Sequence, residues 1–404
     1  MKSFRNNKCP ELAIENECTG CLACVDSCTQ NALEHFIGKD GHFHISFNED
    51  KCIGCKTCER ICYSSRNKSG SNELDKSQVY AAWSANSQDR YNATSGGVFA
   101  AVARCVFNRG GVVVGACLEG RECKHVLITE SKDIERLQGS KYMSSSMAGI
   151  YRVIEKELCK HPVLFSGVGC QCAGVLAFFE KSRYRDNLIT LDLVCGGAPS
   201  RILIDKFYEH YSDVERIVSF RSKDKYELKV LEKGKVKTIL EKTLPLHGFN
   251  CELTNRFNCY HCQFARAHRM TDITIGDLWN YNYMPAEHEN GISTVIVHTK
   301  VGKTLLDEAQ ILLNDLKWKD CINYCKRIVW GNGHIFEPRK NLVYNSVTMD
   351  FETFNKLYCM SMKFYDFNMM IFKIYRFCVM RKNDFKAKKY INLLIKKYEG
   401  DKKI

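Results

Sequence analysis

Apolar runs alternate with helical patterns along the middle of the chain. Three runs, 112–118, 162–167 and 188–195, are mainly apolar and predict buried β-strands, because a strand covered on both faces has few polar positions. The segments 95–107 and 173–182 predict helices between them. Strands that alternate with helices are typical of an α/β domain built on a substantially parallel or mixed sheet.

The pattern changes further along the chain. Residues 214–240 contain three short alternating segments and predict a β-meander. The segments 272–277 and 293–299 predict two more strands. The last hundred residues, which begin with "GKTLLDEAQILLND" at 302–315, are expected to be mostly helical.

Two segments near the N-terminus repeat one cysteine spacing, Cys-x2-Cys-x2-Cys-x3-Cys, at 18–28 and 52–62. In such a run a short turn brings three thiolates to one cubane cluster, and the fourth cysteine, at the start of a helix, binds the neighbouring cluster. The spacing therefore predicts two [4Fe–4S] clusters that carry single electrons. One would be bound by Cys18, Cys21, Cys24 and Cys62, and the other by Cys52, Cys55, Cys58 and Cys28.

The turns within the two runs favour iron–sulfur clusters over zinc. Gly20 and Gly54 take the same place in the two turns and are expected to relieve crowding where the backbone approaches a cluster. Zinc knuckles usually use two Cys-x2-Cys pairs with a longer gap, unlike these interlocked runs. The runs end Cys28-Thr29 and Cys62-Tyr63 where ferredoxin runs normally end Cys-Pro, which changes the turn but removes no ligand.

Four further cysteines stand at positions that would suit a third site. Cys170 follows a predicted strand at the start of a helix, Cys195 ends the next strand, and Cys259 and Cys262 form a Cys-x2-Cys pair. Cysteines at the carboxyl ends of adjacent strands can converge, and the pair would complete four ligands. The alternative is that Cys170 and Cys195 are small buried apolar residues.

Two loops are candidates for anion binding. The segment "TSGG" at 94–97 precedes a predicted helix, where backbone N–H groups are exposed to an anion. The loop "QGSKYMSSS" at 138–146 adds a lysine, a tyrosine and four serines. Together the loops would hold the pyrophosphate of a dinucleotide such as FAD, although paired glycines at a helix start are more often only a cap.

Six segments resemble, in order, the family of coenzyme F420 hydrogenase/dehydrogenase beta subunits, here with an N-terminal two-cluster ferredoxin domain. They are "TSGGVFAAV", "GSKYMSS", "VLFSGVGCQCAGVLAFF", "LDLVCGGAPS", "CYHCQFARAHRMTDITIGDLW" and "GISTVIVHT". The resemblance extends to about residue 341 and implies a flavoprotein that binds FAD beside an iron–sulfur cluster. It departs from the family at Val168-Gly169-Cys170, where Thr-Pro-Cys is common, and at Cys195-Gly196-Gly197, where Cys-His-Gly is common.

The resemblance also implies site residues. It gives the flavin Thr94, Ser95, Gly96, Gly97, Ser140, Lys141 and Tyr142, and gives a third cluster Cys170, Cys195, Cys259 and Cys262. Lys141 would place positive charge near the flavin or be a surface lysine, and Tyr142 would stack on the ring or only pack. Asp272 and Asp277 are either polar site residues or strand ends. No catalytic residue is assigned.

The resulting hypothesis is an FAD-dependent iron–sulfur oxidoreductase. Electrons from a ferredoxin- or flavodoxin-like donor would pass singly through [4Fe–4S] clusters to FAD and on to an organic acceptor. The alternative is an electron-transfer subunit that feeds a separate catalytic partner and has no substrate of its own. Nucleic-acid binding ranks last, because the positive charge is concentrated in one tail and no aromatic RNA-binding signature occurs.

Four parts of the chain are expected. They are a two-cluster ferredoxin domain (1–65), a linker (66–78), an α/β flavin and iron–sulfur domain (79–340) and a basic helical extension (341–404). The predicted fold class is thus α+β followed by α/β, with a C-terminal helical region.

Composition and charge narrow the setting. The chain of 404 residues has no stretch typical of a signal peptide or a membrane-spanning helix, so the cytoplasm is expected. In that reducing compartment, clusters among the 23 cysteines indicate metal sites rather than disulfides. The net charge is +13, and residues 381–404 hold nine Lys and Arg against three Asp and Glu. This tail would pack on the body or contact an anionic membrane surface.

Overall fold

The computed structural model describes residues 9–14, 16–66, 77–223, 227–239, 254–267, 269–279, 281, 287, 289–325 and 327–330. Most of the expected linker and all of the expected C-terminal extension lie outside the described residues, and the domain boundaries stay a prediction. No helix in the described part of the chain is both long and apolar enough to cross a membrane.

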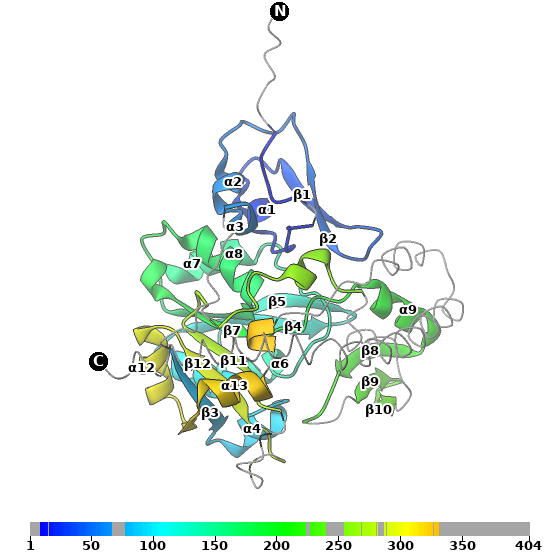
Figure 1. The fold of residues 1–404 in the computed structure, drawn as a ribbon. Coiled ribbons are helices and arrows are strands. Elements are labelled where there is room, and N and C mark those ends of the chain that lie inside the picture. The colour runs from blue at the N-terminus through cyan, green and yellow to red at the C-terminus, as the bar shows by residue number, and fades with distance from the viewer. Residues whose placement is uncertain are drawn as a thin grey trace, which may run out of the picture.

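An eight-stranded mixed sheet forms the centre of the molecule (Figure 1). Its strand order is β13-β3-β12-β11-β7-β6-β4-β5, and the four strands β11, β7, β6 and β4 run parallel. The strands are β3 (Gln78–Ser84), β4 (Val112–Glu119), β5 (Glu122–Ile128), β6 (Val163–Val168), β7 (Leu188–Leu193), β11 (Ile273–Asp277), β12 (Ser293–Val297) and β13 (Ile311–Asp315). The predicted mixed α/β architecture is confirmed.

Helices cover both faces of this sheet. One face packs against α5 (Val98–Asn108), α6 (Ile134–Leu137) and α12 (Lys300–Glu308), and the short α4 (Ser87–Asn92) precedes α5. The other face packs against α7 (Ile150–Leu158) and α8 (Gly169–Phe179) at one end and α13 (Trp318–Tyr324) and α14 (Arg327–Trp330) at the other. Neighbouring strand residues alternate between the two cores: Val113 lies in the first, and Val112 and Val114 lie in the second.

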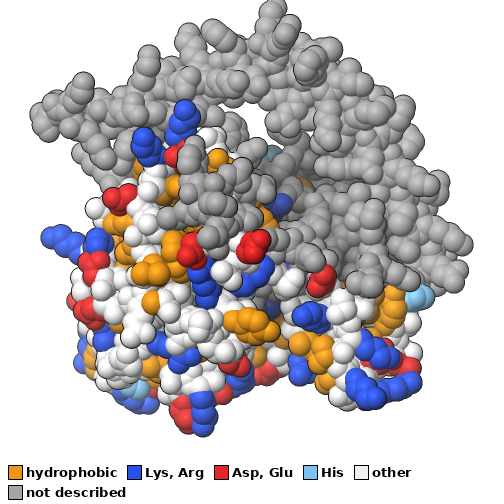
Figure 2. Space-filling model, turned by 90° about the horizontal axis from the view of Figure 1, so that it is seen from below, with side chains coloured by type: hydrophobic (Ala, Val, Ile, Leu, Met, Phe, Trp, Pro, Cys, Tyr) orange, Lys and Arg blue, Asp and Glu red, His pale blue; other side chains and the backbone are white. Residues whose placement is uncertain are grey.

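A smaller antiparallel sheet lies beside the large one (Figure 1). It consists of β8 (Val214–Ser219), β9 (Leu228–Glu232) and β10 (Lys235–Ile239) and packs on α9 (Ile202–His210). The predicted β-meander is therefore confirmed. Figure 2 shows the face of the molecule seen from below Figure 1, where basic and acidic side chains are intermixed over the described residues.

The N-terminal region sits on top of α7 and α8 (Figure 1). Its elements are α1 (Ala23–Ser27), β1 (Leu33–Ile37), β2 (Phe43–Phe47), α2 (Thr57–Ile61) and α3 (Tyr63–Arg66). The strands β1 and β2 form an antiparallel hairpin, and α1 packs against α2.

Two predictions about local structure were wrong. The fourth cysteine of the first run ends a helix instead of starting one, since Cys28 is the C-cap of α1. In the second run Cys62 is the C-cap of α2 and also directly precedes α3, so the expected helix start is found there. The segment 302–315 is not one helix, because it breaks after α12 and its second half forms β13. This strand pairs antiparallel with β3, a partner more than 200 residues away that local periodicity does not reveal.

Hydrogen bonds tie the N-terminal region to the N-terminus of α7. The carboxylate of Asp26 accepts the backbone N–H of Gly149 through Oδ1 (2.9 Å) and that of Tyr151 through Oδ2 (3.3 Å). The Tyr151 hydroxyl donates in return to the carbonyl of Cys21 (2.7 Å). A carboxylate suits this position, because the first N–H groups of a helix have no partner within the helix.

A second contact joins the β1–β2 hairpin to the segment before α9 and to residue 254. Ser200 Oγ donates to the carbonyl of Asp40 (2.7 Å), and His42 Nε2 lies 3.1 Å from the carbonyl of Thr254. Burial lowers the pKa of His42 to about 4, so its imidazole is neutral at pH 7. The two contacts hold the N-terminal region against the large domain.

We expect Asp26→Ala to destabilise the protein by about 1–2 kcal/mol, because two N–H groups at the start of α7 lose their acceptor. Thermal unfolding of anaerobically prepared protein measures this loss. Glu155→Ala is the control, since it removes an exposed carboxylate from the same helix and should change stability by less than about 0.5 kcal/mol. Equal unfolding temperatures for the two variants would contradict the docking role of Asp26.

Candidate functional site

Three cysteines of the first run and the last cysteine of the second surround one space. Cys18, Cys21, Cys24 and Cys62, here called the first quartet, line a cavity of about 330 Å³. Burial raises the pKa of Cys24 well above its usual value, and the thiols of Cys21, Cys18 and Cys62 raise it further. The four thiols are therefore close enough to influence one another's charge.

The remaining cysteines of the two runs surround a separate space. Cys28, Cys52, Cys55 and Cys58, here called the second quartet, line a cavity of about 30 Å³. Cys55 is exposed, so this quartet lies at the surface. Backbone N–H groups point at two of its sulfurs: Ala32 donates to Cys28 Sγ (3.2 Å) and Gly54 donates to Cys52 Sγ (3.4 Å).

The turns of the two runs share an unusual backbone conformation. Gly20 and Leu22 have φ of 69° and 62°, and the matching Gly54 and Lys56 have 70° and 60°. Such alternating left-handed residues turn successive N–H groups toward one concave space, as at many iron–sulfur sites. A Cβ atom at Gly54 would meet no protein atom within 4 Å, so within the protein itself this glycine is needed for its positive φ.

The third set of cysteines gathers at the carboxyl edge of the parallel strands. Cys170 lies in the first turn of α8, directly after β6, and Cys195 lies two residues after β7. Cys259 lies in a 3-10 helix (Phe257–His261), and Cys262 follows it. Negative charge on the thiols of Cys262, Cys195 and Cys259 raises the pKa of Cys170, so the four thiols are neighbours. They are here called the third set.

The third set is buried but supplied with amide donors. Burial raises the pKa of Cys170 well above its usual value and that of Cys259 to about 12. The N–H groups of Gly197 and Ala198 donate to Cys195 Sγ (3.2 Å) and Cys259 Sγ (3.4 Å). Such amides stabilise sulfur that carries negative charge. Among the described residues, no group of three Cys, His, Asp or Glu side chains is placed to bind a single metal ion.

A further cavity of about 290 Å³ lies beside the third set, at the ends of β6, β7 and β11, and is here called the large cavity because its lining is more extensive than that of the first quartet's cavity. This volume is at the lower end of the range of about 300–1,000 Å³ usual for ligand and cofactor pockets. Six of the seven residues predicted to contact a flavin line it: Thr94, Ser95, Gly97, Ser140, Lys141 and Tyr142. Gly96 lies behind the wall, where its N–H donates to Ser293 Oγ (3.0 Å) and a Cβ would be 2.5 Å from the Ala82 carbonyl.

The cavities follow one another through shared walls. Cys170 and Arg256 each line both the cavity of the first quartet and the large cavity. Cys195 also lines the large cavity. The two quartets are close to each other as well, because negative charge on Cys58 of the second quartet raises the pKa of Cys24 in the first. The shared walls and charge contacts therefore give the order second quartet, first quartet, third set and large cavity.

Lys141 is a wall residue of the large cavity. Its ammonium donates to the carbonyls of Leu137 and Gln138 (both 2.7 Å) at the end of α6, and burial lowers its pKa to about 8. The buried Gln138 Oε1 has no hydrogen-bond partner among the described residues. A ligand in the cavity would thus meet both a cation and an unpaired acceptor.

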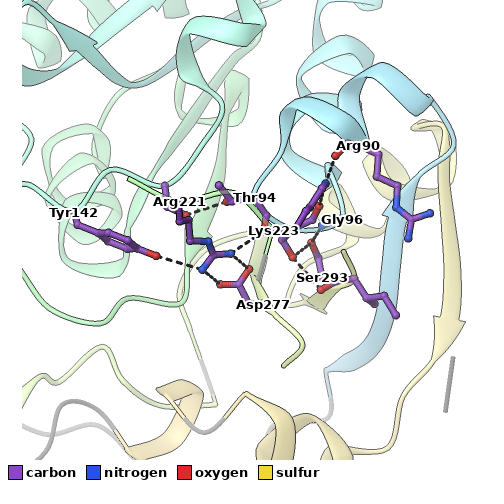
Figure 3. A network of polar contacts seen from close by, with 11 residues as sticks. Arg90, Thr94, Gly96, Tyr142, Arg221, Lys223, Asp277 and Ser293 are labelled. Carbon is purple, nitrogen blue, oxygen red and sulfur yellow. Dashed lines mark hydrogen bonds and ion pairs between the residues drawn. The ribbon is translucent and has the colours of Figure 1, made fainter. Parts of the chain in front are cut away.

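Arg221 holds residues of the cavity wall in place (Figure 3). Its guanidinium donates to both oxygens of Asp277 (3.0 and 2.8 Å), to the carbonyl of Thr94 (2.8 Å) and to the hydroxyl of Tyr142 (3.3 Å). Burial opposes its charge, but Asp277 and Tyr142 hold the pKa of Arg221 above its usual value. Lys223 donates to the carbonyls of Arg90 and Ser95, so two cations that follow β8 hold the 94–97 loop.

The two aspartates that flank β11 have different roles. Asp277 lines the large cavity, whereas Asp272 accepts hydrogen bonds from Thr190 and Thr299 within the fold. Sequence reasoning missed Arg221, Lys223 and Arg256. No local signal identifies them, because isolated basic residues after a strand or in a loop are usually solvated.

Parts of the chain match models of known protein families. Residues 79–151 and 161–313 match the N-terminal and C-terminal parts of the coenzyme F420 hydrogenase/dehydrogenase beta subunit, and residues 17–65 match a 4Fe–4S dicluster domain. The chain is similar to one of the subunits of the F420H2 dehydrogenase of Methanosarcina mazei, with 24% identity over 316 residues that cover 74% of this chain and 84% of the relative.

One solved structure is also similar. It is a chain from the F420-reducing [NiFe] hydrogenase complex of Methanosarcina barkeri, with a TM-score of 0.47 and 18% identity. The match covers 67% of this chain and 91% of that one.

We expect Arg221→Met to destabilise the protein by roughly 3 kcal/mol, because it leaves Asp277 without its partner and releases the Thr94 carbonyl. The double variant Arg221→Met/Asp277→Leu should lose less than the sum of the two single losses, with a coupling energy of about 1–3 kcal/mol. Thermal unfolding of the four proteins measures this cycle. Strictly additive losses would show that the pair does not act as a unit.

Proposed function

Because the chain belongs to the family of coenzyme F420 hydrogenase/dehydrogenase beta subunits, with a 4Fe–4S dicluster domain at its N-terminus, we propose that it is an FAD-dependent iron–sulfur oxidoreductase. Its electrons would come from a ferredoxin- or flavodoxin-like protein and would reach an organic acceptor. The family and the dicluster domain carry the redox role, and the flavin, the third cluster and the acceptor are the proposed parts.

The observation that carries the proposal is the succession of four sites with shared walls. The second quartet lies at the surface, where Cys55 is exposed and a partner protein can reach it. The first quartet and the third set come next, and Cys170 belongs to the third set while also lining the first quartet's cavity. The large cavity comes last, so a relay from a partner to a bound organic molecule needs no step outside the protein.

The donor sets suit the groups that they would hold. Each quartet supplies four thiols around a cavity, and amide N–H groups point at Cys28, Cys52, Cys195 and Cys259. When bound, the clusters would carry single electrons and FAD would exchange two, including a hydride, with the acceptor. In this arrangement the amides stabilise the sulfur, and burial keeps water away from the third set.

The 94–97 and 138–146 loops would hold the flavin. The Thr94 hydroxyl lies 3.0 Å from Ser140 Oγ, so the two loops meet at the cavity wall. Gly97, with φ of 77°, lets the chain turn into the N-terminus of α5, which favours an anionic group such as a pyrophosphate. Lys141 adds a positive charge to the same wall, and Arg221 holds Tyr142 and the Thr94 carbonyl in place.

An electron-transfer subunit without its own substrate is the second candidate. The names of the similar proteins favour it, because one is a dehydrogenase subunit and the other belongs to a hydrogenase complex. The two candidates differ in one test. Reduced, purified protein that transfers electrons to coenzyme F420 or another small acceptor supports the enzyme, whereas transfer only to a partner protein supports the subunit.

We expect anaerobically purified protein to contain about twelve iron atoms and as many inorganic sulfides per chain, four for each cluster. Cys259→Ser should lower both values to about eight, because it removes one ligand of the third set. Cys159→Ser is the matched control, since this exposed thiol lines none of the three cavities and its loss should change neither value. Eight irons in all three proteins would remove the third cluster from the proposal.

We expect about one FAD per chain, released on denaturation and measured by its fluorescence. Ala116→Phe places a large side chain at the wall of the large cavity and should reduce bound flavin at least tenfold while iron stays unchanged. Ala148→Phe adds the same ring at an exposed position and serves as the control. Wild-type protein without flavin would overturn this part of the proposal.

A further inference from the structure

Arg256 occupies the junction between the N-terminal region and the large domain. Its Nε donates to the carbonyl of Cys18 (2.6 Å) and its Nη1 to the carbonyl of Phe43 (2.7 Å). A Cβ atom at Gly20 would lie 3.1 Å from Nη1, so the guanidinium touches the turn of the first quartet. Its own backbone N–H donates to Ala198 (2.8 Å), whose N–H in turn donates to Cys259 Sγ.

The charge of Arg256 has no carboxylate partner in the part of the chain that the structure describes. Three arginines there are nearly fully buried, with exposed fractions of 3% for Arg221, 5% for Arg256 and 8% for Arg269. Arg221 pairs with Asp277, and Arg269 pairs with Asp192. Arg256 donates only to neutral carbonyls.

A buried cation without a counter-charge is costly, so it needs an anion nearby. The cavities on either side of Arg256 are those of the first quartet and the large cavity, and its charge acts on the third-set thiol Cys259. A [4Fe–4S]²⁺ core with four thiolates has a net charge of −2, and one added electron takes it to −3. Thiolate-bound clusters at these two sites would supply the missing anions.

We propose that Arg256 is the shared counter-cation of the first-quartet and third-set clusters and raises their reduction potentials. The added electron makes and breaks no bond, and the redox partner that supplies it is oxidised by one electron. A fixed positive charge stabilises the −3 state more than the −2 state, so the reduced form is favoured. The inference rests on the dicluster domain for the first quartet and on the proposed function for the third set.

A comparison of Arg256→Gln and Arg256→Lys with wild-type protein separates the effect of the positive charge on the potentials from the effect of the hydrogen bonds. In anaerobic redox titrations followed by electron paramagnetic resonance, Arg256→Gln should lower the ratio of reduced to oxidised cluster about tenfold at fixed potential, a shift of about 59 mV to more negative values. Arg256→Lys keeps the charge and should stay near wild type. Titration of Cys259→Ser, which lacks the third set, assigns the signals of the first quartet.

Arg152→Gln is the control. Arg152 also donates to a cysteine carbonyl, that of Cys28 (3.3 Å), but it is exposed, so water and salt screen its charge and its loss should leave the potentials unchanged. The proposal is overturned if Arg256→Gln titrates like wild type, if the Lys and Gln variants shift equally, or if both lose their iron. Iron lost only from Arg256→Gln supports a need for the charge.

These outcomes are distinct from a failure of the proposed function. Wild-type protein without iron, sulfide or flavin would refute that function before any potential is measured. Wild-type protein that contains its clusters, with potentials that do not depend on the charge at position 256, would refute only the role of Arg256.

Discussion

The approach of Cys21 to helix α8 at Gly174 is the contact on which the connection between the two halves of this protein depends. A Cβ atom at Gly174 would lie 3.1 Å from Cys21 Sγ and 2.8 Å from the Tyr151 hydroxyl. Because glycine leaves this space open, the first quartet packs one helical turn away from Cys170, at the start of the same helix. Electron relay requires this closeness, since transfer rates fall steeply with distance.

The same close packing creates an electrostatic problem. Burial raises the pKa of Cys21, Cys24 and Cys170, so the unliganded thiols are protonated at neutral pH. Iron would have to displace these protons, and each cluster of the dicluster domain, like the proposed third one, would then leave net negative charge in a region of low polarity. Backbone amides and the cation of Arg256 are the groups that would face this charge.

The core of the fold could be predicted because its strands are short apolar runs. The local pattern alone predicts the strands β4, β6 and β7 and the pair β11 and β12. The pattern failed for β13, since a strand at the edge of a sheet owes its conformation to its partner β3 and carries polar residues. It also failed at Cys28, where the chain ends a helix of five residues that is too short to show periodicity.

The sequence by itself determined the family and the two cysteine runs, because residue spacing sets these features. Only the tertiary structure decided which sites share walls. Cys170, Cys195 and Cys259 come from separate segments that meet at one edge of the sheet. Arg221 and Arg256 have no local signal, since a buried cation is defined by the groups that surround it and those groups are distant in sequence.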